Sequence, residues 1–270
     1  EGMTLYYPPE LEKATSVIAL DGTPTVELWR LVLGEQMVHR QVLNNEERAH
    51  YLREGLGIQI LQTTDDVKPY NSGTWVSVSS DRALLAAIEQ REGERPTLIS
   101  SKKAIEQYSE AGALLYVDEN THYYDLKGMN DFESVRLGVV IGSPDPSHFE
   151  LQRWGALLGE SVESNGERGW ERSYGEFGDT VLRGLRENEV LQAVMRFGRR
   201  EKNGERGATV YVHTGALPEW VPVERQIAHF DLWDTKERRG MRQVLAAIGS
   251  RTEGTTSDIA DESVIENTPR

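Results

Sequence analysis

The segment from Leu191 to Arg200 carries residue types that bind phosphate. Gln192, Arg196 and Arg199 stand at positions i, i+4 and i+7, so that on a helix they share one face, while the apolar residues between them face a core. Arginine suits this chemistry because its permanently charged, planar guanidinium can grip a phosphate through two hydrogen bonds. It can also neutralise charge that grows on a phosphoryl group during transfer. A solvated amphipathic helix has the same spacing and is the alternative interpretation.

Three further polar segments adjoin apolar runs that predict strands. They contain Gly22, Thr23 and Thr25 after the run 16–20, Ser100, Ser101 and Lys102 at the end of the run 97–100, and Gly128 and Asn130 before the run 137–142. Lys102 would open a helix, and the N–H groups of a helix N-terminus can hold a phosphate. Each segment taken alone also fits an ordinary turn.

Strand and helix patterns alternate along the chain and must position these residues. Apolar runs predict strands at 16–20, 74–78, 97–100, 113–117, 137–142 and 208–213, and helical spacing predicts helices at 48–57, 81–89, 102–108, 149–158 and 181–197. Several strands are too apolar to leave one face in water. This predicts an α/β fold whose parallel sheet is covered on both sides by helices. The segment 26–33 fits either a helix or a strand, and 165–178 fits a surface loop.

The C-terminal part has a different character. Residues 241–248 have helical spacing, and the polar residues from 255 resemble a cap that opens a second short helix. A truncated helix-turn-helix and a frayed polar tail explain this pattern equally well.

Composition and charge exclude several function classes. The chain has 270 residues, with 30 Lys and Arg against 44 Asp and Glu, so its formal net charge is −14. This acidity disfavours a general basic coat for nucleic acid, although a locally basic groove is compatible with it. The absence of cysteine excludes disulfides, thiolate metal sites and cysteine nucleophiles, and the six scattered histidines give no support for a metal site. No apolar run reaches the roughly 20 residues that span a bilayer, and no signal peptide is visible, so we expect a cytoplasmic protein without membrane contact.

The segment that ends at Arg199 resembles motif six of superfamily 2 helicases, which has the form Gln-x-x-Gly-Arg-x-Gly-Arg. Gln192, Arg196, Gly198 and Arg199 match this form, whereas Met195 replaces the first Gly. The resemblance implies the second RecA-like domain of these helicases, in which Arg196 and Arg199 are arginine fingers that reach ATP across an interdomain cleft.

Other motifs follow in the order of that family. The Gly22-Thr23 turn resembles motif three, and Thr25 lies at the same junction between nucleotide and strand-binding surface. Ser100, Ser101 and Lys102 resemble motif four, which implies contacts with the nucleic-acid backbone. Gly128 and Asn130 resemble motif five, which implies a contact with the nucleotide, although Asn130 stands where Asp is customary. Most of 11–223 is also similar to helicase-related proteins of haloarchaeal plasmids and viruses, which agrees with the acidic composition.

No Gly-x4-Gly-Lys-Ser/Thr sequence occurs, so the phosphate-cradling loop is absent from this chain. The acidic pair Asp118-Glu119 fits a surface turn better than a magnesium site. We therefore expect a fragment in which ATP and Mg²⁺ are shared with a first RecA-like domain supplied upstream or by a separate chain.

The expected parts are the end of a first RecA-like domain (1–40), a connector with a small β element at 58–78 (41–94), the second RecA-like domain (95–223), and a linker with the start of a possible helix-turn-helix (224–270). The expected function is the C-terminal portion of an ATP-dependent DNA helicase or translocase. The alternative is a non-enzymatic nucleic-acid-binding or regulatory module. A small-molecule α/β enzyme is least favoured, because no nucleophile–base pair or Gly-x-Gly-x-x-Gly sequence is visible.

Overall fold

The computed structural model describes residues 26–34, 36–126, 130–166, 172–199, 207–223 and 225–226. Gly22, Thr23, Thr25 and Gly128 lie outside the described residues, as does the possible helix-turn-helix.

The described residues form a six-stranded sheet in the order β3-β2-β4-β5-β1-β6, and every neighbouring pair of strands is parallel. The strands are β1 (Ile58–Gln62), β2 (Thr97–Ser100), β3 (Asn120–His122), β4 (Leu137–Ile141), β5 (Ala208–His213) and β6 (Arg225–Gln226). All residues of β2 and β4 are buried. Their continuous apolar runs are explained by helices on both faces, which confirms the expected α/β class with a parallel sheet.

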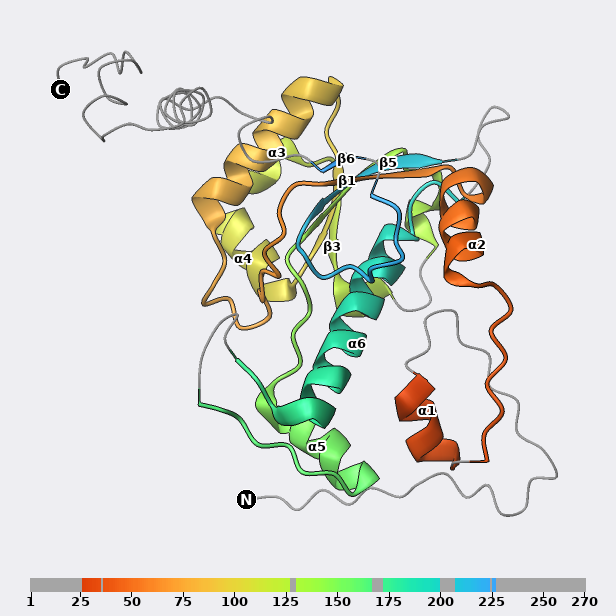
Figure 1. The fold of residues 1–270 in the computed structure, drawn as a ribbon. Coiled ribbons are helices and arrows are strands. Elements are labelled where there is room, and N and C mark those ends of the chain that lie inside the picture. Colours follow the sequence, from red (N-terminus) through yellow and green to blue (C-terminus); the bar gives the residue numbers. More distant parts are fainter. Residues whose placement is uncertain are drawn as a thin grey trace, which may run out of the picture.

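Helices form a layer on each face of this sheet (Figure 1). On one face lie α3 (Val78–Glu92) and α4 (Lys102–Glu110). On the other face lies α6 (Gly175–Val194), with α2 (Asn45–His50) and the π-helical turn η1 (Tyr51–Gly55) beside it. Val139 of β4 packs toward α3 and α4, and the next residue, Val140, packs toward α6. This alternation of side chains along each strand divides the core into two layers.

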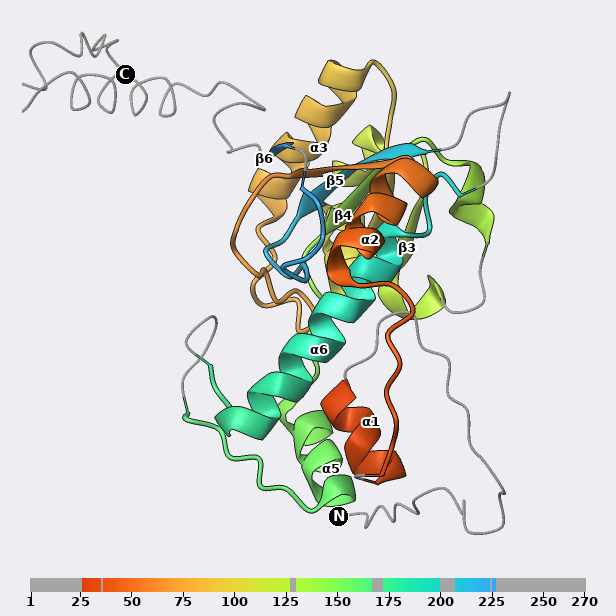
Figure 2. The same cartoon turned by 45° about the vertical axis from the view of Figure 1, so that its right-hand side comes forward.

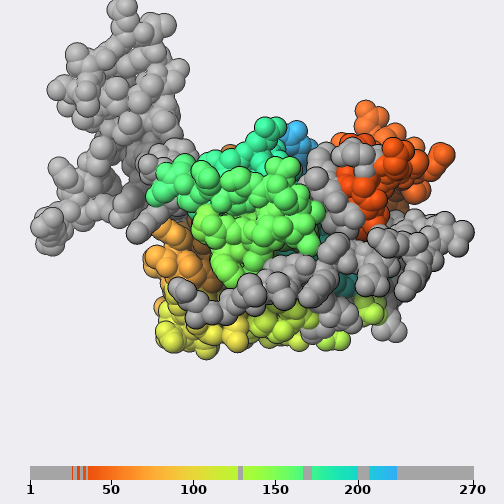
Figure 3. Space-filling view, turned by 90° about the horizontal axis from the view of Figure 1, so that it is seen from below, coloured from red at the N-terminus to blue at the C-terminus, as the bar shows by residue number. Residues whose placement is uncertain are grey.

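Two helices lie beyond these layers. The helix α5 (His148–Leu158) packs against the first half of α6 through a small apolar cluster that includes Leu151, Val181 and Leu182 (Figure 3). The segment 26–33, which the sequence left open, forms the helix α1 (Val26–Leu33), which lies apart from the sheet (Figure 2). No described helix combines the length and apolar character that a membrane span requires.

Three 3₁₀ helices complete the described elements, η2 (Ala113–Tyr116), η3 (Tyr123–Leu126) and η4 (Asp131–Ser134). The first of them corrects the strand predicted at 113–117. Ala113 and Val117 are buried against α3 and α4, so the apolar run serves the helical layer. The strand beside β2 is the polar β3, which as an edge strand needs only backbone pairing on one side.

The strand predicted at 74–78 is also wrong. Residues 71–75 form turns, and α3 begins at Val78. Val76 and Val78 still pack against the core, which explains their apolar character without a strand. The run 58–62, placed by the sequence in a connector, is β1 and pairs with β5 inside the sheet.

Candidate functional site

The turn that follows α6 lies at the amino ends of β4 and β5. Gly198 N donates to Val135 O at 3.0 Å, and Gly207 N donates to Gly198 O at 3.0 Å. Val135 precedes β4, and Gly207 precedes β5. The sheet therefore holds this turn through backbone hydrogen bonds on both sides.

The predicted helix 181–197 ends earlier than expected. α6 ends at Val194, and Arg196 N donates to Ala193 O at 3.1 Å in a tighter turn. Gln192 thus lies on α6, whereas Arg196 and Arg199 lie on the turn, so the expected single helical face is wrong. The cause is Phe197, which is fully buried beside β4. A Cβ on Gly138 of that strand would lie 2.6 Å from the Phe197 ring, so a glycine is required there.

The turn brings two of the sequence-predicted residues together. Arg199 Nη2 donates to Asn130 Oδ1 at 2.9 Å, although the two residues are far apart in the sequence. The Nε of Arg199 is buried and has no hydrogen-bond acceptor among the described residues. The Asn130 amide therefore fixes the Nη2 side of the Arg199 guanidinium, whereas its Nε–H has no acceptor among the described residues.

Arg196 lies close enough to Arg199 for their charges to interact. Burial and then the positive charge of Arg199 lower the pKa of the Arg196 guanidinium, while Glu189 acts in the opposite direction. Two adjacent guanidinium groups repel each other, and an anion placed between them relieves that repulsion. Phosphate oxygens have the charge and the acceptor geometry that such a pair favours.

These guanidinium donors suit an anionic ligand but supply no metal ligands. In the part of the chain that the structure describes, no three His, Asp or Glu side chains gather as they would around a metal ion. If ATP binds here with Mg²⁺, the carboxylates for the metal must come from outside this site.

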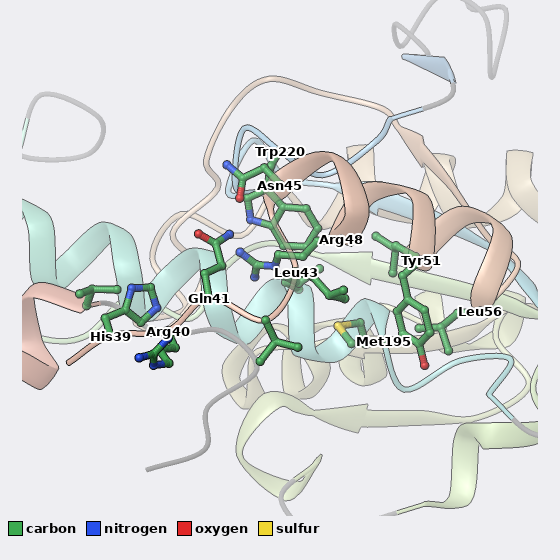
Figure 4. A pocket seen from close by; sticks show the side chains of 14 residues that line it. His39, Arg40, Gln41, Leu43, Asn45, Arg48, Tyr51, Leu56, Met195 and Trp220 are labelled. Atoms are coloured by element: carbon green, nitrogen blue, oxygen red, sulfur yellow. The ribbon is translucent and has the colours of Figure 1, made fainter. Parts of the chain in front are cut away.

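A cavity of about 430 Å³ lies beside the last turn of α6 (Figure 4). Its apolar wall includes Leu191 and Met195, together with Leu52 from η1. The Arg48 guanidinium stacks 3.9 Å from the centre of the Trp220 ring at the same cavity, and burial lowers the pKa of Arg48. No sequence motif predicted this cavity. The one feature of the sequence that could have indicated the cavity is Met195, an apolar residue where the resembled motif six has its first glycine.

Ser100, Ser101 and Lys102 lie at the opposite, carboxyl edge of the sheet. Ser100 Oγ donates to Ile141 O at 2.7 Å, and Ser101 Oγ donates to Tyr70 O at 2.9 Å. Both serines are buried, and Ser101 also caps α4 by accepting from Ala104 N. These hydroxyls are therefore used inside the fold, and only Lys102, at the exposed start of α4, presents its side chain to solvent.

A buried polar cluster that no sequence motif predicted also lies at this carboxyl edge. Thr63 Oγ1 lies 2.6 Å from His213 Nδ1, and His213 Nε2 lies 3.5 Å from Asp81 Oδ1. Tyr108 OH donates to Asp81 Oδ2 at 2.8 Å. Thr63, His213 and Asp81 have the residue types of a hydroxyl–imidazole–carboxylate triad. However, all four residues are fully buried or nearly so, so a substrate has no access and the cluster acts within the fold.

Comparisons of the chain with protein-family models, with curated proteins and with solved structures found no match.

Proposed function

We propose that this chain is the C-terminal portion of an ATP-dependent DNA helicase or translocase, built on a RecA-like sheet. Arg196 and Arg199 would contact the triphosphate that a first RecA-like domain holds. The observation that carries this proposal is the hydrogen bond from Arg199 to Asn130, with Arg196 beside it at the same edge of the sheet. It joins two residues for which different motifs of the same family resemblance imply a nucleotide contact.

Asn130 would position Arg199 without neutralising it. An aspartate at this position would form an ion pair with the guanidinium and compete with the phosphate for it. The neutral amide accepts one hydrogen bond and leaves the full positive charge for the nucleotide. Arginine contacts of this kind stabilise the charge that develops as the γ-phosphoryl group is transferred.

The first test is whether the gene encodes a phosphate-binding loop and an Asp-Glu box in frame upstream of this chain, or in a partner chain. The second is ATP turnover by the protein that contains both domains. Arg199→Ala is expected to lower kcat by about 10³-fold, as for other arginine fingers. Arg82→Ala, which removes an exposed arginine of α3, is the matched control and should retain wild-type turnover.

Near-normal turnover by Arg199→Ala would contradict the assignment, as would ATP hydrolysis by this chain alone. Absence of ATP turnover from the protein that contains both domains, combined with intact strand binding, would favour the non-enzymatic nucleic-acid-binding module instead.

A further inference from the structure

A second cavity, of about 420 Å³, opens at the carboxyl edge of the sheet. It lies between the loop that precedes α3 and the loop from β4 to α5, and we call it the Trp75 pocket. Asn71, Ser72, Trp75, Ser147 and Arg172 line it. Its volume falls in the range of pockets that take small organic ligands, about 300–1,000 Å³.

The loop that carries Trp75 is fixed to α4. Gln107 Nε2 donates to Gly73 O at 2.8 Å, and Ser101 Oγ donates to Tyr70 O. Gly73 has a φ of +77°, and a Cβ there would lie 2.9 Å from Gln107 Nε2, so glycine is needed for this approach. Despite this anchoring, the Trp75 side chain is 50% exposed. A rigid loop therefore presents a large aromatic ring to solvent, next to a polar cavity.

The opposite wall carries charges of both signs, from Asp145, Glu150 and Arg172. Asp145 accepts two hydrogen bonds from Arg186, at 2.7 and 3.0 Å, and one from Arg172 Nη2 at 2.5 Å. One carboxylate thus faces two guanidinium groups. The Nε of Arg172 is buried and has no hydrogen-bond acceptor among the described residues. Glu150 adds a negative charge at the rim, but its carboxylate is held by Ser147 N at 3.0 Å.

Hydrogen bonds also fix the orientation of Asn71 in the pocket. Asn71 Nδ2 donates to Asp145 O at 2.7 Å and to Tyr124 OH at 3.3 Å, which leaves the Asn71 carbonyl oxygen for another donor. The pocket therefore combines one aromatic face, amide and hydroxyl groups at the sides, and the side chain of Arg172, which is 23% exposed and whose Nη2 is hydrogen-bonded to Asp145.

We propose that the Trp75 pocket holds one base of a single-stranded nucleic acid, stacked on the Trp75 ring, with a backbone phosphate at Arg172. This inference rests on the proposed function and names a part of its strand-binding surface. Stacking on an aromatic side chain requires a base that is free of its complementary strand, so a single strand fits and a closed duplex does not. Every base has a π-face, and the contact is therefore tolerant of sequence.

The test is binding of fluorescently labelled oligothymidine by the full 270-residue chain at low ionic strength, followed by anisotropy. Trp75→Ala is expected to weaken binding about tenfold to a hundredfold, the usual effect of removing one stacking ring. Trp75→Phe should retain most of the affinity. Leu115→Ala is the matched control, since Leu115 is 66% exposed on η2 and does not line the pocket.

Salt dependence tests the phosphate contact. Arg172→Gln should reduce the slope of log K against log salt by about 0.7, the value for one phosphate contact on a single strand. Because Arg172 also binds Asp145, thermal unfolding of this variant is measured alongside, and the Trp75 variants provide the test if it unfolds.

Equal affinity of wild type and Trp75→Ala would overturn the inference, and so would a wild-type chain that does not bind the oligonucleotide. Neither result bears on the arginine assignment, which ATP turnover tests separately. Conversely, normal turnover by Arg199→Ala would remove the proposed ATP role and leave a measured Trp75 effect in place.

Discussion

His213 is a fully buried histidine between Thr63 and Asp81. Burial has the largest effect on its pKa and lowers it below the usual 6.5, while the neighbouring Asp81 carboxylate acts in the opposite direction. The folded protein therefore resists protonation of this ring, whereas the unfolded chain accepts a proton at an ordinary histidine pKa.

This difference predicts that His213 makes stability depend on pH. Between the lowered folded pKa and about 6.5, the unfolded state binds more protons, so the free energy of unfolding falls as the pH is lowered. The slope from this one group reaches at most about 1.4 kcal/mol per pH unit. Above about pH 7 the group is neutral in both states and its contribution is constant.

The measurement is urea unfolding from pH 7.5 to 5 for wild type and His213→Gln, whose side chain cannot titrate. The stability difference between the two proteins should shrink toward acid pH. His50→Gln on the exposed face of α2 should follow the wild-type profile. Parallel profiles for wild type and His213→Gln would show that the buried imidazole does not control this response.

Single residues also show what the sequence could predict. Arg196, Arg199 and Asn130 were predicted as nucleotide contacts because short motifs place them. That role stays a prediction, although the structure brings Arg199 and Asn130 into contact. Trp75 and His213 were not identified, because their roles depend on distant parts of the chain. Thr63 and His213, for example, are 150 positions apart, and no local pattern reports such a pair.

At the level of elements, the sequence predicted β2, β4, β5 and the helices α3 to α6 close to their observed positions, since continuous apolar runs and helical spacing are strong signals. The sequence also predicted strands at 74–78 and 113–117, which the structure does not contain. It misplaced β3, because an edge strand of polar residues has no such signal. It also extended α6 to Phe197, because the apolar spacing continues past Val194. The helix ends there because tertiary packing of Phe197 determines the turn.

The turn after α6 should depend on Gly198. Its φ is +64°, and a Cβ there would lie 2.7 Å from Ala208 N and closer still to the carbonyl group of Gly207. Gly198→Ala must therefore push the turn away from β5, which moves Arg199 from Asn130. We expect a loss of about 2 kcal/mol or more in the free energy of unfolding, together with loss of Arg199-dependent ATP turnover.

Gly159→Ala separates backbone strain from this clash. Gly159 has a similar φ of +73° and nothing within 4 Å of its Cβ position, so its replacement should cost only about 1 kcal/mol. Urea unfolding of both variants gives the comparison. Equal losses would mean that the contact with Gly207 does not hold the turn in place.

Across the whole molecule, β4 connects the two candidate sites. Its amino end lies beside the turn that carries Arg199, and its carboxyl end leads to Asp145 of the Trp75 pocket. Its five residues span about 16 Å. Substitutions this far apart without shared partners have nearly additive effects. Variants at the two candidate sites can therefore be interpreted separately.

The net charge of −14 belongs to the chain as a whole. Like charges on a compact surface repel one another and destabilise the folded state, and salt screens this repulsion. We therefore expect KCl to stabilise the protein, with most of the gain below about 1 M, where the Debye length has fallen to about 3 Å. A gain of about 1 kcal/mol corresponds to a rise in Tm of about 2–4 °C for a chain of this size.

A charge variant distinguishes screening from general salting-out. Glu54, Glu94 and Glu119 are exposed, and replacing all three by lysine removes three negative charges and adds three positive ones. This variant should be more stable than wild type at low salt and should gain less from KCl, because less repulsion remains to be screened. Exclusion of salt from the surface would instead stabilise both proteins equally and increase steadily with concentration. Thermal unfolding across a KCl series decides between the two, and an equal response would reject charge repulsion as the cause.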